Sequence, residues 1–258
     1  MRITWLDSNS WLIDWQGSRW LIDPWLVGIL TFGDTPWLFR QVRKQERPLP
    51  ENIDVVLLSQ GLPDHAHPPT LKALYERSPE LQVICSRNAL PVVAPVGFRQ
   101  VIPLDHGQEI TVQNRFQIRA TVGAPIGPFS RENGYIVKDL QTNISFYYEP
   151  HGYPDPQLAE FAPVTIGIAP VINLKIPFVG SLINGKDSAP QMAEALQIRY
   201  ILPTAMGGDL EFGGLLLKFL QVEGSIAELK QRTRAQVLEP QPWVEMTIST
   251  ECVSGHPE

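Results

Sequence analysis

The first 27 residues contain short runs of aromatic and β-branched side chains, broken by polar positions, that predict three β-strands. The runs are Arg2–Leu6, Ser10–Trp15 and Ser18–Asp23, and the Gln16–Gly17 pair between the last two is typical of a tight hairpin turn. Six of the seven tryptophans precede residue 38. They favour one filled face of a sheet, although an apolar ligand mouth or a membrane-touching patch would use the same side chains.

A continuous apolar run, Ile53–Leu58, predicts a strand buried on both faces. The polar loop Ser59–His67 follows it, and two prolines then open a predicted helix over Thr70–Arg77. Another predicted strand, Leu81–Cys85, completes a βαβ unit. Ligands collect in the loop at the carboxyl end of such a strand, so residues 59–67 are the first place to look for a site.

The middle of the chain is rich in predicted strands, and the last third returns to alternating strands and helices. The strands are Val101–Leu104, Glu109–Val112, Arg115–Val122, Gly134–Lys138, Ile144–Tyr148, Val164–Ala169 and Tyr200–Leu202. Capping-box spacing at Ser188–Gln191 and at Ser225–Glu228 predicts two helices that end near residues 197 and 234.

Two segments lack a regular period. Residues 28–52 are irregular and carry basic side chains at Arg40, Arg43, Lys44 and Arg47. A connection of this length is typical of a lid or a substrate-lining segment, although a charge run is also typical of a plain solvated face. Residues 207–214 are glycine-rich without a phosphate-loop lysine, which predicts a flexible loop over a cleft.

Composition narrows the class of protein. The chain has 258 residues, of which 43% are apolar and 19% charged, so it can bury a core. The net charge of −6 argues against nucleic-acid binding. No stretch is long and apolar enough to predict a transmembrane span or a signal peptide. The two cysteines, Cys85 and Cys252, suit a reducing compartment, and we expect a cytoplasmic protein.

The candidate chemistry begins with three side chains in four residues: Asp64, His65 and His67. Imidazole nitrogen and carboxylate oxygen are ordinary ligands for zinc or iron. The alternative is that Asp64 caps the following turn and that both histidines are solvent-exposed loop residues. His106 lies in a predicted hairpin turn and His256 in a polar tail, so we expect neither to take part.

Several stretches resemble the metallo-β-lactamase superfamily, in the branch similar to ascorbate-6-phosphate lactonases and N-acyl-phosphatidylethanolamine phospholipases. The stretches are Ile3–Ile13, Trp20–Leu26, Ile53–Ser59 and Arg199–Gly208, in the order of the family. The resemblance implies an α/β fold, a four-layer αββα sandwich. It also implies a single domain over 1–258, with two similar halves at roughly 1–125 and 126–240, a tail at 241–258, and an active site between the sheet edges.

The family's metal-binding signature, His-x-His-x-Asp-His, falls on residues 60–65 and is only partly kept. Gln60 and Leu62 stand at the first two histidines, whereas Asp64 and His65 match. The third-motif histidine falls near residues 122–126, approximately at Ile126, and the last one on Ala205. The resemblance therefore implies that the first of two metal positions is absent.

A single-metal site remains possible. In the family a bridging aspartate falls at Pro150, which Glu149 and His151 flank here. We expect Asp64 and His65, with either Glu149 or His151, to hold zinc or another divalent metal, and water to complete the shell. A metal with other ligands, through His67, and an empty cleft without metal are the alternatives.

The resemblance implies that Asp23 supports this site from behind, although it could equally cap the turn at Pro24. It also implies a hydrolase for an ester, lactone or phosphodiester, in which Asp64 and His65 are the catalytic residues and Asp64 orients a water or receives its proton. The substrate would be a small molecule, anionic if the basic residues 40–47 contact it, or with an apolar tail if the tryptophans do. The four replaced ligand positions favour an inactive binding or scaffold protein instead. Hydrolysis without metal has no Gly-x-Ser-x-Gly elbow to support it.

Overall fold

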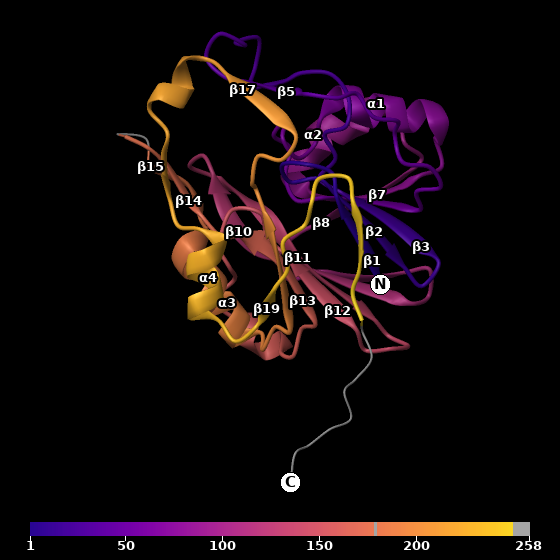
Figure 1. The fold of residues 1–258 in the computed structure, drawn as a ribbon. Coiled ribbons are helices and arrows are strands. Elements are labelled where there is room, and N and C mark those ends of the chain that lie inside the picture. The colour runs from indigo at the N-terminus through magenta and orange to yellow at the C-terminus, as the bar shows by residue number, and fades with distance from the viewer. Residues whose placement is uncertain (178–179, 250–258) are drawn as a thin grey trace.

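The structure, a computed structural model, describes residues 1–177 and 180–249. Its frame is two seven-stranded sheets (Figure 1). The first has the order β20 (Glu245–Thr247), β1 (Arg2–Trp5), β2 (Trp11–Trp15), β3 (Ser18–Ile22), β6 (Val55–Leu58), β7 (Gln82–Ser86) and β8 (Gln100–Leu104). The second has the order β19 (Gln236–Val237), β16 (Tyr200–Thr204), β13 (Ile166–Pro170), β12 (Ser145–Tyr148), β11 (Ser130–Asp139), β10 (Phe116–Ile126) and β9 (Glu109–Val112).

Both sheets combine an antiparallel meander with parallel strands. In the first, β1, β2 and β3 are antiparallel, and β3, β6, β7 and β8 are parallel. In the second, β9 to β12 are antiparallel, and β12, β13, β16 and β19 are parallel. The predicted strands and the Gln16–Gly17 hairpin are therefore confirmed, with ends shifted by a few residues.

The main hydrophobic core lies between the two sheets. Trp15 packs on Phe116 and Phe146 with ring centroids 4.9 and 5.8 Å apart, and Trp20 meets Phe116 at 5.4 Å. Burial of such large rings is the main force that holds two sheets face to face. Five of the six early tryptophans are buried, which confirms that they mainly fill a sheet face, whereas Trp37 is 63% exposed.

Helices cover the outer faces. The helix α1 (Pro68–Arg77) and the short α2 (Leu90–Val93) lie against the first sheet, where they bury Leu71, Leu74 and Val93. The helices α3 (Gly185–Ala195) and α4 (Ile226–Arg232) lie against the second, where Met192 and Leu229 join the core. Figure 1 shows the two helix pairs on opposite sides of the sheets. The order helix, sheet, sheet, helix confirms the predicted four-layer αββα sandwich.

The division of residues 1–258 into one domain with two similar halves and a tail stays a prediction. The chain passes from the first large sheet to the second between Leu104 and Glu109, rather than near residue 125. Part of the expected tail, β20, pairs with β1. Cys252 and His256 lie outside the described residues, whereas Cys85 is a buried free thiol in β7.

Two small sheets complete the fold. One consists of β4 (Leu30–Thr31), β5 (Arg40–Arg43) and β17 (Leu210–Gly213), and the other of β14 (Asn173–Ile176), β15 (Gly180–Asn184) and β18 (Gln221–Glu223). The prediction of a flexible loop over residues 207–214 is therefore wrong in its centre. Backbone hydrogen bonds to β5 fix residues 210–213 as a strand, and Figure 1 shows these two segments, far apart in sequence, side by side.

The start of α3 also differs from the prediction. It begins at Gly185 rather than after Ser188, because the side chain of Asn173 accepts the Lys186 N–H at 3.0 Å and so caps the helix from a neighbouring strand. The Ser188 hydroxyl instead donates to the Asn184 carbonyl within the first turn. The second capping box is confirmed, because Ser225 Oγ accepts the Glu228 N–H at 3.1 Å.

The remaining helical turns are short 3₁₀ segments. They cover Arg87–Ala89, Ala94–Val96, Leu158–Phe161 and Leu215–Lys218. Within the described ranges, each helix is too short or too polar to cross a bilayer.

Candidate metal centre

Three of the residues singled out in the sequence come together in space. One possible ligand atom from each of Asp64, His65 and His151 lies within 4.8 Å of the other two. Asp64 and His65 lie in the loop after β6, and His151 lies just after β12 in the other large sheet. The centre therefore forms where loops at the carboxyl ends of strands from both sheets meet.

The His65 ring is fully buried and held by a carboxylate. Its Nδ1 lies 2.7 Å from Asp23 Oδ2. The other ring nitrogen, Nε2, lies 3.1 Å from Asp64 Oδ2 and 3.3 Å from the Asn9 amide nitrogen. Burial lowers the pKa of His65, but Asp64 and Asp23 raise it more, to well above its usual value. A proton or a metal cation can meet this demand for positive charge between two carboxylates.

Asp23 is the anchor of this arrangement. Its carboxylate accepts hydrogen bonds from the Ser59 N–H at 2.7 Å, the Ser59 hydroxyl at 2.5 Å and the Tyr148 hydroxyl at 2.6 Å. Its backbone has φ of 41°, in the left-handed region that only a few non-glycine residues adopt. Of the two roles considered for Asp23, the contacts favour support of His65.

His151 has a matching support. Its Nδ1 lies 2.8 Å from Glu132 Oε2, which leaves Nε2 without a hydrogen bond to any described residue. Burial is the main cause that lowers the pKa of His151, to about 4, and the neighbouring His65 lowers it further. The ring is therefore neutral at pH 7, donates from Nδ1 to Glu132, and keeps the lone pair of Nε2 free.

Asp64 completes the set. Its Oδ1 accepts no hydrogen bond from any part of the chain that the structure describes, although its side chain is only 17% exposed. Burial raises the pKa of Asp64, but His65 lowers it more, so the carboxylate is ionised at neutral pH. A buried anionic oxygen without a partner is unusual and calls for a ligand.

These observations fit a divalent cation. Two imidazoles and one carboxylate are a common ligand set for zinc. Metal-bound histidines usually donate their other ring N–H to a carboxylate, and both His65 and His151 have one, in Asp23 and Glu132. The residues present therefore fit one metal ion at Asp64, His65 and His151.

Glu149 is not part of this cluster. Its carboxylate accepts the backbone N–H groups of His151 at 3.2 Å, Gly152 at 2.6 Å and Tyr153 at 2.9 Å. Burial and the neighbouring Glu132 carboxylate raise the pKa of Glu149 well above its usual range, and the two side chains share a hydrogen bond. Glu149 shapes the turn that presents His151.

The other two histidines within the described ranges lie apart from the cluster. His67 is buried beside Trp25, its Nδ1 is 3.0 Å from Thr70 Oγ1, and burial lowers its pKa to about 4. His106 is exposed in the turn before β9, as expected, and contacts the Glu132 carbonyl at 3.0 Å.

Sequence reasoning missed Glu132. It lies two residues before the predicted start of its strand, and β11 in fact begins at Ser130. Gly123 on the neighbouring strand makes room for it, because a Cβ there would lie 2.6 Å from Glu132 Cγ. Extending the predicted strand by two residues would have placed this charged side chain on a buried strand, which is a signal for a functional group.

The residues that the resemblance would place at ligand positions of the family have other surroundings here. Gln60 is buried and donates from Nε2 to Glu132 Oε2 at 3.1 Å. Leu62 is 41% exposed, and Ala205 has a left-handed φ of 56°. Gln60 is thus used in a hydrogen bond within the protein, and Leu62 has no atom that could bind a metal. In the family signature, both positions are metal ligands.

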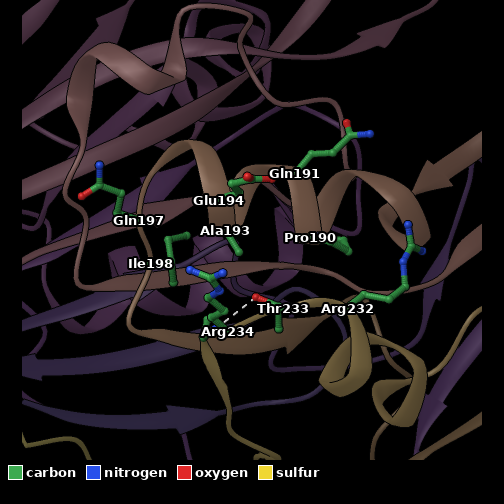
Figure 2. A pocket seen from close by; sticks show the side chains of 10 residues that line it. Pro190, Gln191, Ala193, Glu194, Gln197, Ile198, Arg232, Thr233 and Arg234 are labelled. Carbon is green, nitrogen blue, oxygen red and sulfur yellow. Dashed lines mark hydrogen bonds between the residues drawn. The ribbon is translucent and has the colours of Figure 1, made fainter.

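A cavity of about 430 Å³ opens beside the cluster and includes Asp64 and His151 in its wall. A larger one, of about 630 Å³, lies between α3 and residues 232–235 (Figure 2). None of the three cluster residues lines the larger cavity, and its Arg232 is paired with Asp187 at 2.9 Å. Because only the smaller of these two cavities contains residues of the cluster, it is the candidate substrate site.

Comparisons with known proteins agree with this architecture. The family model described as a beta-lactamase superfamily domain matches residues 2–205. Among curated proteins, none matches the sequence significantly.

Solved structures share the fold at low sequence identity. A metallo hydrolase from Ignicoccus hospitalis, Igni18, has 12% identity over 97% of this chain and 99% of its own, with a TM-score of 0.67. An isothiocyanate hydrolase from Delia radicum gut bacteria has 16% identity over 97% and 100%, with a TM-score of 0.67. A possible metal-dependent hydrolase from Veillonella parvula has 15% identity over 96% and 99%, with a TM-score of 0.68.

Proposed function

This chain belongs to the beta-lactamase superfamily, and on that premise we propose that it is a hydrolase with a single divalent metal ion held by Asp64, His65 and His151. The observation that carries the proposal is the pair of supported imidazoles. Each ring has its Nδ1 on a buried carboxylate, Asp23 or Glu132. The Nε2 of His151 has no hydrogen bond to a described residue, and that of His65 lies 3.1 Å from the Asp64 carboxylate, so both nitrogens lie at the cluster. Glu149, the other candidate ligand, is left out because three backbone amides occupy it.

Zinc is the proposed ion, since it favours four ligands and commonly takes three from the protein and one from water at catalytic sites. When bound, such an ion makes a water molecule more acidic and polarises the bond under attack in an ester, lactone or phosphodiester. The Asp64 carboxylate is also proposed to orient this water or to receive its proton. His65 holds its orientation through Asp23, so the Asp64–His65 pair stays fixed.

The first test is metal content. Protein purified without a histidine tag or chelator is expected to bind one zinc per chain, measured by elemental analysis after dialysis against Zn²⁺. Asp64→Asn and His151→Asn are expected to lose it, whereas His106→Asn, a histidine in an exposed turn, should keep it. Two ions per chain, or full occupancy in both ligand variants, would contradict the proposed ligand set.

A second candidate function is that of a binding protein without catalysis. Gln60 and Leu62 favour it, because they replace two ligands of the family signature. It would follow if the wild-type protein bound no metal and showed no turnover of generic ester, lactone or phosphodiester substrates with added Zn²⁺ or Mn²⁺. In either case we propose a small-molecule ligand and a cytoplasmic location, which the free buried thiol of Cys85 supports.

A further inference from the structure

The cavity beside the proposed metal centre has a mostly apolar wall. The apolar side chains come from three places. Phe32 and Phe39 precede β5, Leu62 lies in the loop after β6 with Ile126 at the end of β10, and Leu182 in β15 and Leu216 in a 3₁₀ turn complete the wall. The polar part of the wall consists of Asp64, His151, Gln60, Thr35, Tyr153 and Ser181. Such a cavity binds apolar groups because it removes their surface from water.

The described part of the cavity wall contains no lysine or arginine. The basic cluster at residues 40–47, a possible anion site from the sequence, has other partners. Arg43 is buried in an ion pair with Asp7 at 2.9 Å, and Arg47 lies 3.8 Å from Asp209. An anionic substrate would therefore find no lysine or arginine in this wall, and only the proposed metal ion would offset its charge beside the Asp64 carboxylate.

The replaced metal-ligand positions lie in this same wall. Gln60 and Leu62, at two positions of the signature, and Ile126, near the third-motif position, all line the cavity. The part of the cavity near the absent metal position is therefore open to an apolar group.

We propose that this cavity binds an uncharged apolar group of the substrate, so that the protein hydrolyses neutral carboxylic esters or lactones with a hydrophobic acyl portion rather than phosphodiesters. The reaction class rests on the proposed function above. In the step, the oxygen of a water molecule bonds to the carbonyl carbon and the acyl C–O bond breaks. One water proton passes to the alcohol oxygen, and the other is released to solvent as the acid ionises. The carboxylate product is charged, and the apolar wall, which has no lysine or arginine, favours its release.

Chain-length dependence tests the substrate class. With zinc-loaded protein, kcat/KM for p-nitrophenyl esters is expected to rise at least about tenfold from acetate to hexanoate, since each buried methylene can contribute up to about fourfold. Bis-p-nitrophenyl phosphate should be slower than the hexanoate by at least about a hundredfold. A flat or falling ester series, or preference for the phosphodiester, would overturn the inference.

A binding measurement separates the cavity from the catalysis. The neutral dye N-phenyl-1-naphthylamine should bind to the metal-free protein, detected by fluorescence, and decanol should displace it. Leu182→Asp and Leu216→Asp are expected to weaken binding at least about tenfold. Leu140→Asp is the matched control, because Leu140 is 47% exposed and Leu182 40%, but Leu140 does not line the cavity.

The outcomes are distinguishable. If the protein binds no metal but Leu182→Asp and Leu216→Asp still weaken dye binding, the proposed function is wrong. The inference that the cavity binds an apolar group is then still supported. If zinc binds but the dye does not bind, or binds equally in all folded variants, the assignment of the cavity is wrong. Circular dichroism of each variant identifies any that fails to fold, and the two cavity variants lie on different elements.

Discussion

At the scale of single residues, the candidate site depends on carboxylates that do not touch a metal. Asp23 receives two hydrogen bonds from Ser59 and one from Tyr148, and so holds one imidazole from behind. Glu132 has the same relation to His151, and its other oxygen accepts the Ala124 N–H at 3.1 Å. Outer carboxylates of this kind fix the tautomer and the direction of the ligand ring, so they contribute to metal affinity.

The substitution Glu132→Gln tests this role. The variant keeps the shape of the side chain, but the NH₂ group of an amide can only donate. That group would face either the Ala124 N–H or the donors that now contact Oε2, so at least one hydrogen bond would be lost. Zinc affinity, measured by competition with a chromophoric chelator, is expected to fall about 10- to 100-fold.

The matched control is Glu109→Gln, which changes a surface glutamate paired with Arg119 at 2.7 Å. It should bind zinc as the wild type does. Unchanged zinc affinity in Glu132→Gln, with the folded state intact, would show that Glu132 does not position His151.

At the scale of elements, side-chain contacts from neighbouring strands and turns stabilise the ends of strands. The long hairpin of β10 and β11 ends at Asp139, whose carboxylate accepts two hydrogen bonds from Arg115 at 2.9 and 2.7 Å and one from the Thr142 hydroxyl at 2.7 Å. Burial raises the pKa of Asp139, but these contacts lower it more, to about 2. This end of the hairpin is therefore stabilised by an ionised carboxylate.

Asp139→Asn is expected to lower the free energy of unfolding by about 2 kcal/mol at pH 6.5, the usual value for hydrogen bonds to a charged group. Because the folded-state pKa is depressed, the wild-type advantage is complete above the unfolded pKa of about 3.9 and is lost as the pH falls through about 2. Urea denaturation at pH 6.5 and at pH 3 should show the difference between the two proteins narrowing.

Asp105→Asn provides the comparison, because Asp105 also makes two hydrogen bonds with one arginine, Arg87, but on the exposed surface. A much smaller effect is expected there, since solvent screens exposed pairs. Equal effects at the two positions would argue against burial as the reason for the strength of the Asp139 pair.

At the scale of the whole molecule, distant segments are joined near the N-terminus. Asp7 accepts hydrogen bonds from Arg43 at 2.9 Å, from the Trp243 indole at 2.8 Å and from the Asp209 N–H at 2.8 Å. The Arg43 guanidinium also lies 4.7 Å from the Trp25 ring centre. The segment that lines the cavity is thus fixed to both ends of the described chain.

The proposed metal centre also joins the two sheets, so metal binding should stabilise the whole fold. Zn²⁺ at about 100 times its Kd contributes about 2.7 kcal/mol, which corresponds to a rise in Tm of about 5–10 °C for a chain of this size. Calorimetry of the wild type with and without Zn²⁺ measures the shift. Asp64→Asn should show almost none, and an equal shift in that variant would place the ion elsewhere.

The sequence by itself determined most strands of the two large sheets, the helices α1 and α4, and the family. Alternating and continuous apolar runs such as Ile53–Leu58 are local signals. A run of this kind predicts a strand because its side chains must be buried, and a strand in a sheet buries them. The same is true of the second capping box, where Ser225 and Glu228 contact each other without help from the rest of the chain. The start of α3 was mispredicted because its cap, Asn173, comes from another strand.

Only the tertiary structure decided which residues share the site. Asp64 and His151 are 87 residues apart, and the choice between Glu149 and His151 depended on which side chain the turn after β12 directs toward Asp64 and His65. The support from Glu132 and the apolar cavity at Leu62 arise where the loops of two facing sheets meet. Residue types state which chemistry is available, but distances between sheets depend on how the core between them packs, and no local pattern encodes those distances.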